Sequence, residues 1–370
     1  MAKRVLLIAT VDQHIRHFHL PLINELYNQG YKIDIASNGD EKFENIENKY
    51  SIPFQRNPFS KKNYDAFKKL EFILNQNHYN YIHVNTPVGS VIGRLAARKF
   101  RKTGTKVIYT AHGFHFFKGA PIKNWLIYFP LELLLSHFTD NLLVMNSEDY
   151  KRAKKFYRTP NIKYIDGVGV DNTKFSPPTE KEKENLRESL GYDTKDTIVL
   201  YVAEVSKRKN QKFIIDTLIL HTNNLNNIKF IFIGKGELLD ELKDYVFKNG
   251  LETKIDFLGY RNDVSSFMKI ADIVVSSSLQ EGLPVNIIEA QMTEIPCIVS
   301  DSRGNRDLVV DGINGIVFSL DDDGKNRLYQ GILELHKDKI KRTKFGQANK
   351  FLTEKYSIDT VIKEIIDIYS

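Results

Sequence analysis

Short apolar runs alternate with longer amphipathic stretches through the first half of the chain. Phe18, Leu22 and Leu26 follow one another at helical spacing, as do Leu20, Ile23 and Tyr27. Strands that alternate with helices form parallel sheets covered on both faces, so this half predicts one α/β domain. The expected strands are Val5–Ala9, Lys32–Ala36, Tyr81–Val84, Lys106–Thr110, Asn141–Met145 and Lys163–Ile165.

The alternation stops near residues 166–178, where Gly167, Gly169, Pro177 and Pro178 indicate a loop or linker. It then resumes, which predicts a second α/β unit of similar size. The expected strands are Ile198–Ala203, Lys229–Ile233, Lys254–Leu258, Ile273–Ser276 and Cys297–Ser300. The expected helices lie near 179–190, 208–221, 236–249, 283–293 and 338–353, and Asp359–Tyr369 predicts a terminal helix.

The predicted fold class is α/β, with two Rossmann-like domains whose parallel sheets face each other across a cleft. We expect domains at 1–168 and 169–353, and a C-terminal helix within 354–370 that packs back on the first domain. Open parallel sheets bind ligands at the carboxyl ends of their strands. A ligand shared between two such edges is typical of a transferase.

The composition is that of an ordinary globular protein, with 42% hydrophobic and 27% charged residues. No window reaches the ~18 apolar residues that a membrane span needs, and the longest candidate, Trp125–Leu135, contains Pro130 and Glu132. No signal peptide is recognised, and the single Cys297 excludes an internal disulfide and a cysteine-cluster metal site. We therefore expect a cytoplasmic protein.

The charge is unevenly distributed along the chain. Residues 1–168 carry 25 Lys and Arg against 14 Asp and Glu, whereas residues 169–370 carry 28 against 32. A basic first half suits an anionic partner such as a phospholipid surface, a lipid diphosphate or a nucleic acid. The alternative is that these residues only solubilise helix faces, since no block of five or more positive residues occurs.

The strongest local signal is the segment EGLPVNIIE, which begins at Glu281 and ends at Glu289. Gly282 allows close approach of a ligand to the backbone, and Pro284 suits the first turn of the helix that follows. The free N–H groups of a helix start favour an anion such as a diphosphate. Glu289 lies about two turns further along, and carboxylates accept hydrogen bonds from vicinal sugar hydroxyls. The alternative is a capped helix with exposed glutamates.

This element resembles the Glu-x7-Glu signature of the family 4 retaining glycosyltransferases, which have the GT-B fold. The resemblance spans nearly the whole chain and is closest to bacterial capsule and exopolysaccharide enzymes. It also includes the segments YVAEVSKRKNQ (201–211), FIGKGE (232–237), FLGYRNDV (257–264), PCIVSDSRGNRDLVVDGINGIVF (296–318), TAHGFHF (110–116) and MNSEDYKRA (145–153).

The resemblance implies roles for individual residues of the second domain. Glu281 would contact hydroxyls of the donor sugar, Glu289 would hold the ribose hydroxyls, and Lys209 would neutralise the departing diphosphate. The segment Gly282, Leu283, Pro284 and Val285 would present backbone N–H groups to sugar and phosphate, Pro284 excepted. Gly234, Arg208, Tyr260, Arg261 and Asn262 complete the implied donor contacts, the last three beside the base.

One position of the donor segment departs from the family pattern. Glu204 stands where the family commonly has an Arg, and a carboxylate there would repel a diphosphate. Arg208 or Lys207 could supply the missing charge. No Asp-x-Asp metal motif occurs, so we expect a nucleotide sugar as co-substrate and no required metal or other cofactor.

In the first domain, the resemblance places His112 beside the transferred sugar, and the position of His112 after a predicted strand agrees. The family's first loop is often rich in glycine, whereas here it is TVDQHIRHFH (10–19). We expect Asp12, His14, Arg16 and His17 to present side chains to the acceptor. A metal site is the less favoured alternative, because His14 and His17 would share a helical face while His19 would point elsewhere.

The segment Lys118–His137 combines lysines, aromatic residues and a leucine run. Such a mixture suits a membrane interface. The alternative, which we favour slightly, is a buried helix of the first domain.

These observations predict a retaining transfer of a hexose or N-acetylhexosamine from a nucleoside-diphosphate sugar, with uridine favoured, to a hydroxyl acceptor. The expected acceptor is a lipid-linked or surface-polysaccharide intermediate at the inner face of the cytoplasmic membrane, and no nucleic acid is expected as a partner. By resemblance, the leaving phosphate would take the acceptor proton. The alternatives are a nucleotide-sugar epimerase of the same fold and a non-catalytic basic binding protein.

Overall fold

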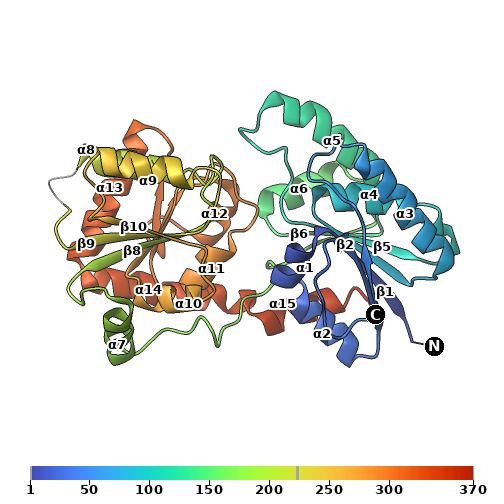
Figure 1. The fold of residues 1–370 in the computed structure, drawn as a ribbon, viewed down its shortest axis with the longest axis horizontal. Helices are drawn as coiled ribbons and strands as arrows, with labels where there is room; N and C mark the ends of the chain where they lie inside the picture. Colours follow the sequence, from blue (N-terminus) through green and yellow to red (C-terminus); the bar gives the residue numbers. More distant parts are fainter. Residues whose placement is uncertain (1, 222–224, 370) are drawn as a thin grey trace. The chain divides into compact units, whose positions relative to one another are not determined.

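The computed structural model describes residues 2–221 and 225–369. They form two compact units, of which the first runs to Gly169 and resumes at Ile358, and the second is Val170–Ser357. Each unit is an open parallel sheet with helices on both faces (Figure 1). Two Rossmann-like units are present, which confirms the predicted α/β fold class.

The first unit contains a seven-stranded sheet in the order β3-β2-β1-β4-β5-β6-β7, with every neighbouring pair parallel. Its strands are β1 (Arg4–Val11), β2 (Lys32–Asn38), β3 (Asn48–Ser51), β4 (Tyr81–Asn85), β5 (Lys106–Ala111), β6 (Asn141–Val144) and β7 (Asn161–Tyr164). Its α-helices are α1 (Asp12–Phe18), α2 (Leu20–Asn28), α3 (Lys62–Gln76), α4 (Pro87–Ala97), α5 (Ile122–Ser136), α6 (Ser147–Phe156) and α15 (Ile358–Ile366).

The C-terminal helix α15 packs against α2 within this unit. Lys163 Nζ donates to the carbonyl of Glu364, at 2.7 Å. The carbonyl of Tyr369 accepts hydrogen bonds from the hydroxyls of Tyr31 and Tyr81, at 2.7 and 2.6 Å. The end of the chain is therefore fixed to the same sheet as its beginning.

The second unit contains a six-stranded sheet in the order β10-β9-β8-β11-β12-β13, also parallel throughout. Its strands are β8 (Thr197–Val202), β9 (Ile228–Ile233), β10 (Ile255–Gly259), β11 (Ile273–Ser276), β12 (Cys297–Ser300) and β13 (Gly315–Phe318). Its helices are α7 (Glu180–Leu190), α8 (Gln211–Leu220), α9 (Leu239–Lys248), α10 (Val264–Ile270), α11 (Val285–Met292), α12 (Arg303–Leu308), α13 (Asp322–Lys337) and α14 (Lys339–Thr353).

The strands of the second sheet bury both faces, which explains their continuous apolar runs. In β8, Val199 and Tyr201 pack into the core beneath α8, α9 and α13. Ile198 and Leu200 point the other way, into the core formed with α10 and α11. Alternate residues of one strand thus serve two cores, and the sheet is held rigidly between them.

Strands β3 and β13 and helices α10, α12 and α13 were not predicted from the sequence. The edge strand β3 is only partly buried and has no apolar run to identify it. Helices α10 and α12 have only seven and six residues, too few for a periodic pattern to stand out.

Candidate functional site

Two loops of the second unit bring Lys209 and Glu281 together. Lys209 follows β8 and Glu281 follows β11, and Lys209 Nζ lies 2.5 Å from Glu281 Oε1. Arg208 Nη1 lies 3.5 Å from the other carboxylate oxygen. Glu281 is only 5% exposed. Burial alone would raise the pKa of its carboxyl, but Lys209 and Arg208 hold the pKa below its ordinary value. The site therefore contains a buried carboxylate and two cations.

Polar contacts under these loops fix their geometry. The hydroxyl of Tyr201, on β8, donates to the carbonyl of Lys209 at 2.5 Å. Ser277 Oγ donates to the carbonyl of Asn210 at 2.7 Å. The backbone N–H of Leu279 donates to the carbonyl of Arg208 at 2.9 Å. The two loops are thus bonded to each other as well as to the sheet, so Lys209 is held in place by more than its ion pair.

Arg303, the first residue of α12, is a part of this site that the sequence analysis missed. Its guanidinium is buried, and Nε donates to the carbonyl of Glu281 at 2.9 Å. The next residue, Gly304, packs so closely on the backbone of Gly282 that an added Cβ would lie 2.4 Å from its carbonyl oxygen. Only glycine fits there, and the start of α12 therefore holds the Glu281–Gly282 turn from behind.

Helix α11 begins directly after this turn, with Pro284 as its N-cap residue. The carbonyl of Pro284 accepts hydrogen bonds from the N–H groups of Ile287 and Ile288, at 3.1 and 3.3 Å. The first N–H groups of the helix have no partner within it and carry its positive end. The side-chain Nδ2 of Asn286 is buried here without a hydrogen-bond partner among the described residues. Asn286 was not predicted as a contact, and its free amide suits an oxygen-rich ligand.

Glu289 lies further along α11 and has a different environment from Glu281. No side chain in the described ranges forms a hydrogen bond or ion pair with its carboxylate. Burial raises the pKa of Glu289 to about 7, and the more distant Lys174 offsets this only in part. Near neutral pH this carboxyl is thus partly protonated, and groups that donate hydrogen bonds to its ionised form would lower its pKa.

The predicted base-binding residues follow β10. Tyr260 is 57% exposed, and Arg261 forms a bidentate ion pair with Asp263, at 2.8 and 2.6 Å. Gly234, which follows β9, has a φ of 149° and donates its N–H to the carbonyl of Gly259 at 2.8 Å. This bond joins the ends of β9 and β10.

The predicted donor contacts in the loops therefore lie at one edge of the sheet, the carboxyl ends of β8, β9, β10 and β11, and Glu289 lies within α11, which begins at that edge. Open α/β sheets bind their ligands at this edge. Glu204, the departure from the family pattern, is exposed at the same edge, whereas Arg208 lies close to Glu281. Both cations considered as replacements for the missing Arg are exposed, and Arg208 is the one that lies 3.5 Å from Glu281.

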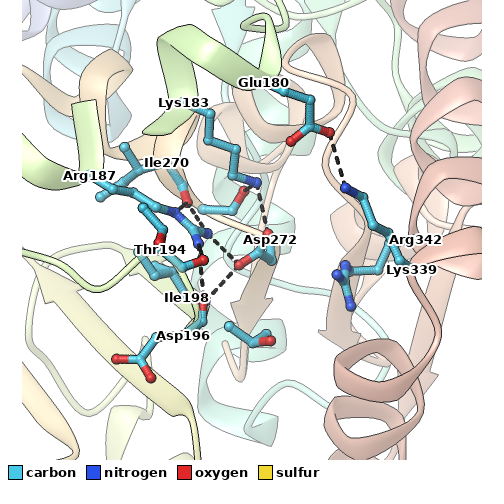
Figure 2. A network of polar contacts seen from close by, with 12 residues as sticks. Glu180, Lys183, Arg187, Thr194, Asp196, Ile198, Ile270, Asp272, Lys339 and Arg342 are labelled. Carbon is cyan, nitrogen blue, oxygen red and sulfur yellow. Dashed lines mark hydrogen bonds and ion pairs between the residues drawn. The ribbon is translucent and has the colours of Figure 1, made fainter. Parts of the chain in front are cut away.

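A cavity of about 400 Å³ occupies the opposite edge of the second unit, at the amino ends of β8, β11 and β12. Figure 2 shows the polar network on its wall, centred on Asp272. Asp272 accepts from Lys183 Nζ at 2.7 Å, from Arg187 Nη2 at 2.6 Å and from the N–H of Ile198 at 2.8 Å. These bonds tie α7 to two strands, which gives the network a structural role.

Replacing Asp272 by Ala is expected to lower the free energy of unfolding by about 3–5 kcal/mol, since it leaves the buried Arg187 charge without its partner. Urea denaturation measures the loss. Glu180→Ala is the matched control, because Glu180 pairs with Lys339 at 3.3 Å on the exposed surface. That pair is worth about 1 kcal/mol or less. Equal losses in the two variants would refute the structural role.

The first unit brings together three histidines. One ring nitrogen from each of His14, His19 and His112 lies within 4.8 Å of the others. The prediction that His19 would point away from His14 is therefore wrong, whereas His14 and His17 both lie on α1, as expected. Helix α1 ends at Phe18, and His19 has a φ of −124° and a ψ of −3°, so helical periodicity does not extend to it. His17 is exposed, with Nδ1 2.6 Å from the carbonyl of Gln13 in its own helix.

The remaining predicted acceptor contacts have protein partners. The carboxylate of Asp12 is buried and accepts from Ser37 Oγ at 2.5 Å, from Lys49 Nζ at 2.9 Å and from the N–H of Glu41 at 2.9 Å. Arg16 pairs with Glu41 at the surface. These bonds hold the loop after β2 against α1. Acceptor binding by Asp12 and Arg16 stays a prediction.

Helix α5 is only partly buried, which corrects the preference for a buried helix. Its inner face holds Glu132, bonded through both oxygens to Arg94 at 2.9 Å. Its outer face exposes Ile122, Leu126 and Leu134, with Leu126 at 72%. No helix in the described part of the chain has both the length and the apolar character needed to cross a bilayer.

Comparisons with known proteins show the family of this chain. The family described as Glycosyl transferases group 1 matches residues 182–351, and the family described as Glycosyl transferase 4-like matches residues 4–146. The chain is 38% identical over 376 residues to EpsD of Bacillus subtilis, described as a glycosyltransferase, covering 100% of this chain and 97% of that protein. It is 29% identical over 303 residues to an Escherichia coli UDP-Gal:alpha-D-GlcNAc-diphosphoundecaprenol alpha-1,3-galactosyltransferase, covering 80% of this chain and 76% of the relative.

Solved structures with the same fold cover nearly the whole chain. HepE of Anabaena, solved in complex with UDP and glucose, has a TM-score of 0.80 at 18% identity and covers 99% of both chains. WaaG, a glycosyltransferase involved in lipopolysaccharide biosynthesis, has a TM-score of 0.78 at 14% identity, again over 99% of both chains. At these identities the likeness shows the fold alone.

Two Rossmann-like units, each built on an open parallel sheet, make up the architecture of the GT-B glycosyltransferases. The chain belongs to the glycosyltransferases of the family 4 type and is a transferase. Of the three functions that the sequence left open, the comparisons support this one.

Proposed function

We propose that the protein transfers a hexose or N-acetylhexosamine, with retention of anomeric configuration, from a uridine-diphosphate sugar to a hydroxyl acceptor. The observation that carries the proposal is the Lys209–Glu281 pair, with Arg208 beside it, at the start of α11. Cations, helix N–H groups and hydroxyl-accepting carboxylates are what a sugar diphosphate requires. In support of uridine, HepE was solved with UDP-glucose, and the name of the E. coli relative includes UDP-Gal.

Within this proposal, the N–H groups of the Gly282–Val285 segment and the amide of Asn286 receive the diphosphate. Lys209 and Arg208 stabilise the negative charge that develops as the diphosphate leaves. Glu281 accepts hydrogen bonds from hydroxyls of the sugar, and Glu289 from those of the ribose. These groups provide the neutralisation that a divalent ion supplies in other transferases, so no metal is required for transfer. The place of His112 beside the transferred sugar stays a prediction.

A donor screen tests the proposal. A true donor is expected to stabilise the protein by about 2.7 kcal/mol at a hundredfold excess over its dissociation constant, seen as a rise in melting temperature. Release of free UDP only when acceptor is present distinguishes transfer from epimerisation, and the NMR coupling of the product's anomeric proton reports retention. A donor that stabilises Glu289→Ala as well as the natural protein would contradict the proposed site.

We further propose that the acceptor is lipid-linked or part of a surface polysaccharide, met at the inner face of the cytoplasmic membrane. The name of the E. coli relative includes a diphosphoundecaprenol acceptor. The first half of this chain is basic, and α5 presents Ile122, Leu126 and Ile127 to solvent near Lys118 and Lys123. Apolar side chains flanked by lysines bind the surface of anionic bilayers.

The double variant Ile122→Asp and Leu126→Asp is expected to reduce co-sedimentation with phosphatidylglycerol vesicles at least tenfold, because it removes apolar contact and adds repulsive charge. Ile340→Asp in α14 is the matched control, since Ile340 is 83% exposed on the other unit. Equal co-sedimentation of the double variant and the control would refute membrane contact through α5. Co-sedimentation of the double variant that persists in high salt would refute it as well.

A further inference from the structure

Three imidazoles meet where β1 and β5 end in the first unit. His14 lies on α1, which follows β1, His19 lies at the break between α1 and α2, and His112 follows β5. His14 Nε2 and His112 Nε2 are 3.1 Å apart. The ring centroids of His14 and His19 are 5.1 Å apart, and those of His19 and His112 are 5.9 Å apart. Each ring therefore borders the other two.

His14 and His112 lie within hydrogen-bond distance of each other, but His19 has a ring nitrogen that the described part of the protein leaves unsatisfied. His19 is 4% exposed, and its Nε2 has no hydrogen-bond partner among the described residues. A buried nitrogen without a partner destabilises the fold unless something binds it. The neighbouring His83 differs, because Nδ1 lies 2.5 Å from the hydroxyl of Tyr369 and Nε2 lies 2.7 Å from Thr110 Oγ1. His83 is thus fully occupied, whereas His19 is available to a ligand.

His19 is buried, and His14 and His112 are half-buried, so the cluster is largely shielded from water. A neutral imidazole has one ring nitrogen with a free lone pair, which is the form that binds transition metals.

We propose that His14, His19 and His112 bind one divalent transition-metal ion of the Zn²⁺ type and leave a fourth coordination position open. The donor set selects this class, because imidazole nitrogen suits Zn²⁺, Cu²⁺ and Ni²⁺, whereas Mg²⁺ and Ca²⁺ require oxygen ligands. The nearest carboxylate on the same helix, Asp12, is bonded to Ser37, Lys49 and Glu41.

The geometry requires little rearrangement. Nitrogens bound to a tetrahedral Zn²⁺ at about 2.0–2.1 Å stand roughly 3.3 Å from one another. His14 and His112 are already at that separation. Only the His19 ring has to approach, by an amount on the order of 1 Å, and it lies at a helix break where a small backbone adjustment is possible.

A metal ion bound by the three histidines would inhibit sugar transfer, an expectation that rests on the proposed function. The ion would take ring nitrogens of His14 and His112, two predicted contacts of the acceptor and the transferred sugar. One equivalent of Zn²⁺ is then expected to inhibit transfer while leaving the binding of UDP unchanged.

The test is calorimetric titration of the full-length, chelator-treated protein with Zn²⁺. The expected result is one ion per chain with a dissociation constant below about 10 µM, and a loss of at least tenfold in affinity in both His19→Gln and His14→Gln. His17→Gln is the matched control, because His17 is on the same helix but exposed and outside the cluster. Titration with Co²⁺, followed by visible absorption, reports tetrahedral coordination independently.

Binding of UDP to each variant, measured on the same samples, checks that the protein is folded and is independent of the histidines. Equal Zn²⁺ affinity in His14→Gln, His17→Gln and the natural protein would overturn the proposal, as would the absence of binding tighter than millimolar in a protein that binds UDP. Zn²⁺ binding that depends on His14 in a protein that binds no UDP would support the metal site and contradict the donor site.

Discussion

Lys209→Met is expected to lower kcat about 100- to 1,000-fold, the effect typical of removing one group that stabilises charge developing in a transition state. Lys209 Nζ is the nearest cation to the buried Glu281 carboxylate, at 2.5 Å, while Arg208 is further away at 3.5 Å. The substitution also removes the group that opposes the effect of burial on the pKa of Glu281. Steady-state release of UDP in the presence of acceptor measures the loss.

Lys212→Met is the matched control for this experiment. Lys212 is in the helix that follows the same loop, but it pairs with Asp216 on the exposed face of α8, at 2.7 Å. Its replacement is expected to leave kcat within about twofold. Circular dichroism of both variants separates lost catalysis from lost folding. A folded Lys209→Met variant with kcat near that of Lys212→Met would show that Lys209 does not act on the leaving group.

The affinity for UDP-glucose is expected to rise with pH through about 7 and then to level off. Glu289 has a pKa of about 7 in the free protein because it is buried, and only its ionised form accepts hydrogen bonds from both ribose hydroxyls. Below pH 7 each unit of pH should cost up to about tenfold in affinity, because binding must first remove a proton. UDP-glucose suits the titration because its diphosphate does not ionise in this range.

The same pKa predicts the pH dependence of stability. The carboxyl of an unfolded Glu titrates near 4.3, so folding raises the pKa of Glu289 and favours its protonated form. The resulting contribution to the free energy of unfolding is fully present below about pH 4.3 and is lost as pH rises through 7. Glu289→Gln should flatten both the binding and the stability profile in this window, whereas the exposed Glu252→Gln should leave both unchanged. A binding profile for Glu289→Gln that still rises through pH 7 would assign the titration to another group.

Much of the fold could be predicted because the strands of both sheets are buried on two faces. Ile273–Ser276 and Cys297–Ser300 were predicted with the bounds that β11 and β12 have, since apolar runs there end at polar loops. The edge strand β3 lacks such a run, because only Tyr50 of its four residues packs against the core. Helix α13 was missed although Leu328, Ile332 and Leu335 follow helical spacing, so this pattern was available in the sequence.

The candidate site was predictable only where its residues share a local motif. The motif EGLPVNIIE predicted Glu281 just before a helix and Glu289 within it. The resemblance to the family 4 glycosyltransferases added Lys209. The contact of Arg303 with the Glu281 carbonyl depends on how α12 packs behind the turn, which no periodicity encodes. The cluster of His19 with His14 and His112 likewise depends on a helix break and on the pairing of distant strands. Both contacts depend on tertiary packing, so they could not be predicted from the sequence pattern.

The account depends on a diphosphate that binds at the start of α11, and a crystal structure of the protein with UDP tests this most directly. We predict phosphate oxygens within hydrogen-bond distance of the N–H of Val285 and of Lys209 Nζ, with ribose hydroxyls on Glu289. Phosphate density instead at the opposite edge of the sheet, in the cavity beside Lys183 and Arg342, would contradict the account.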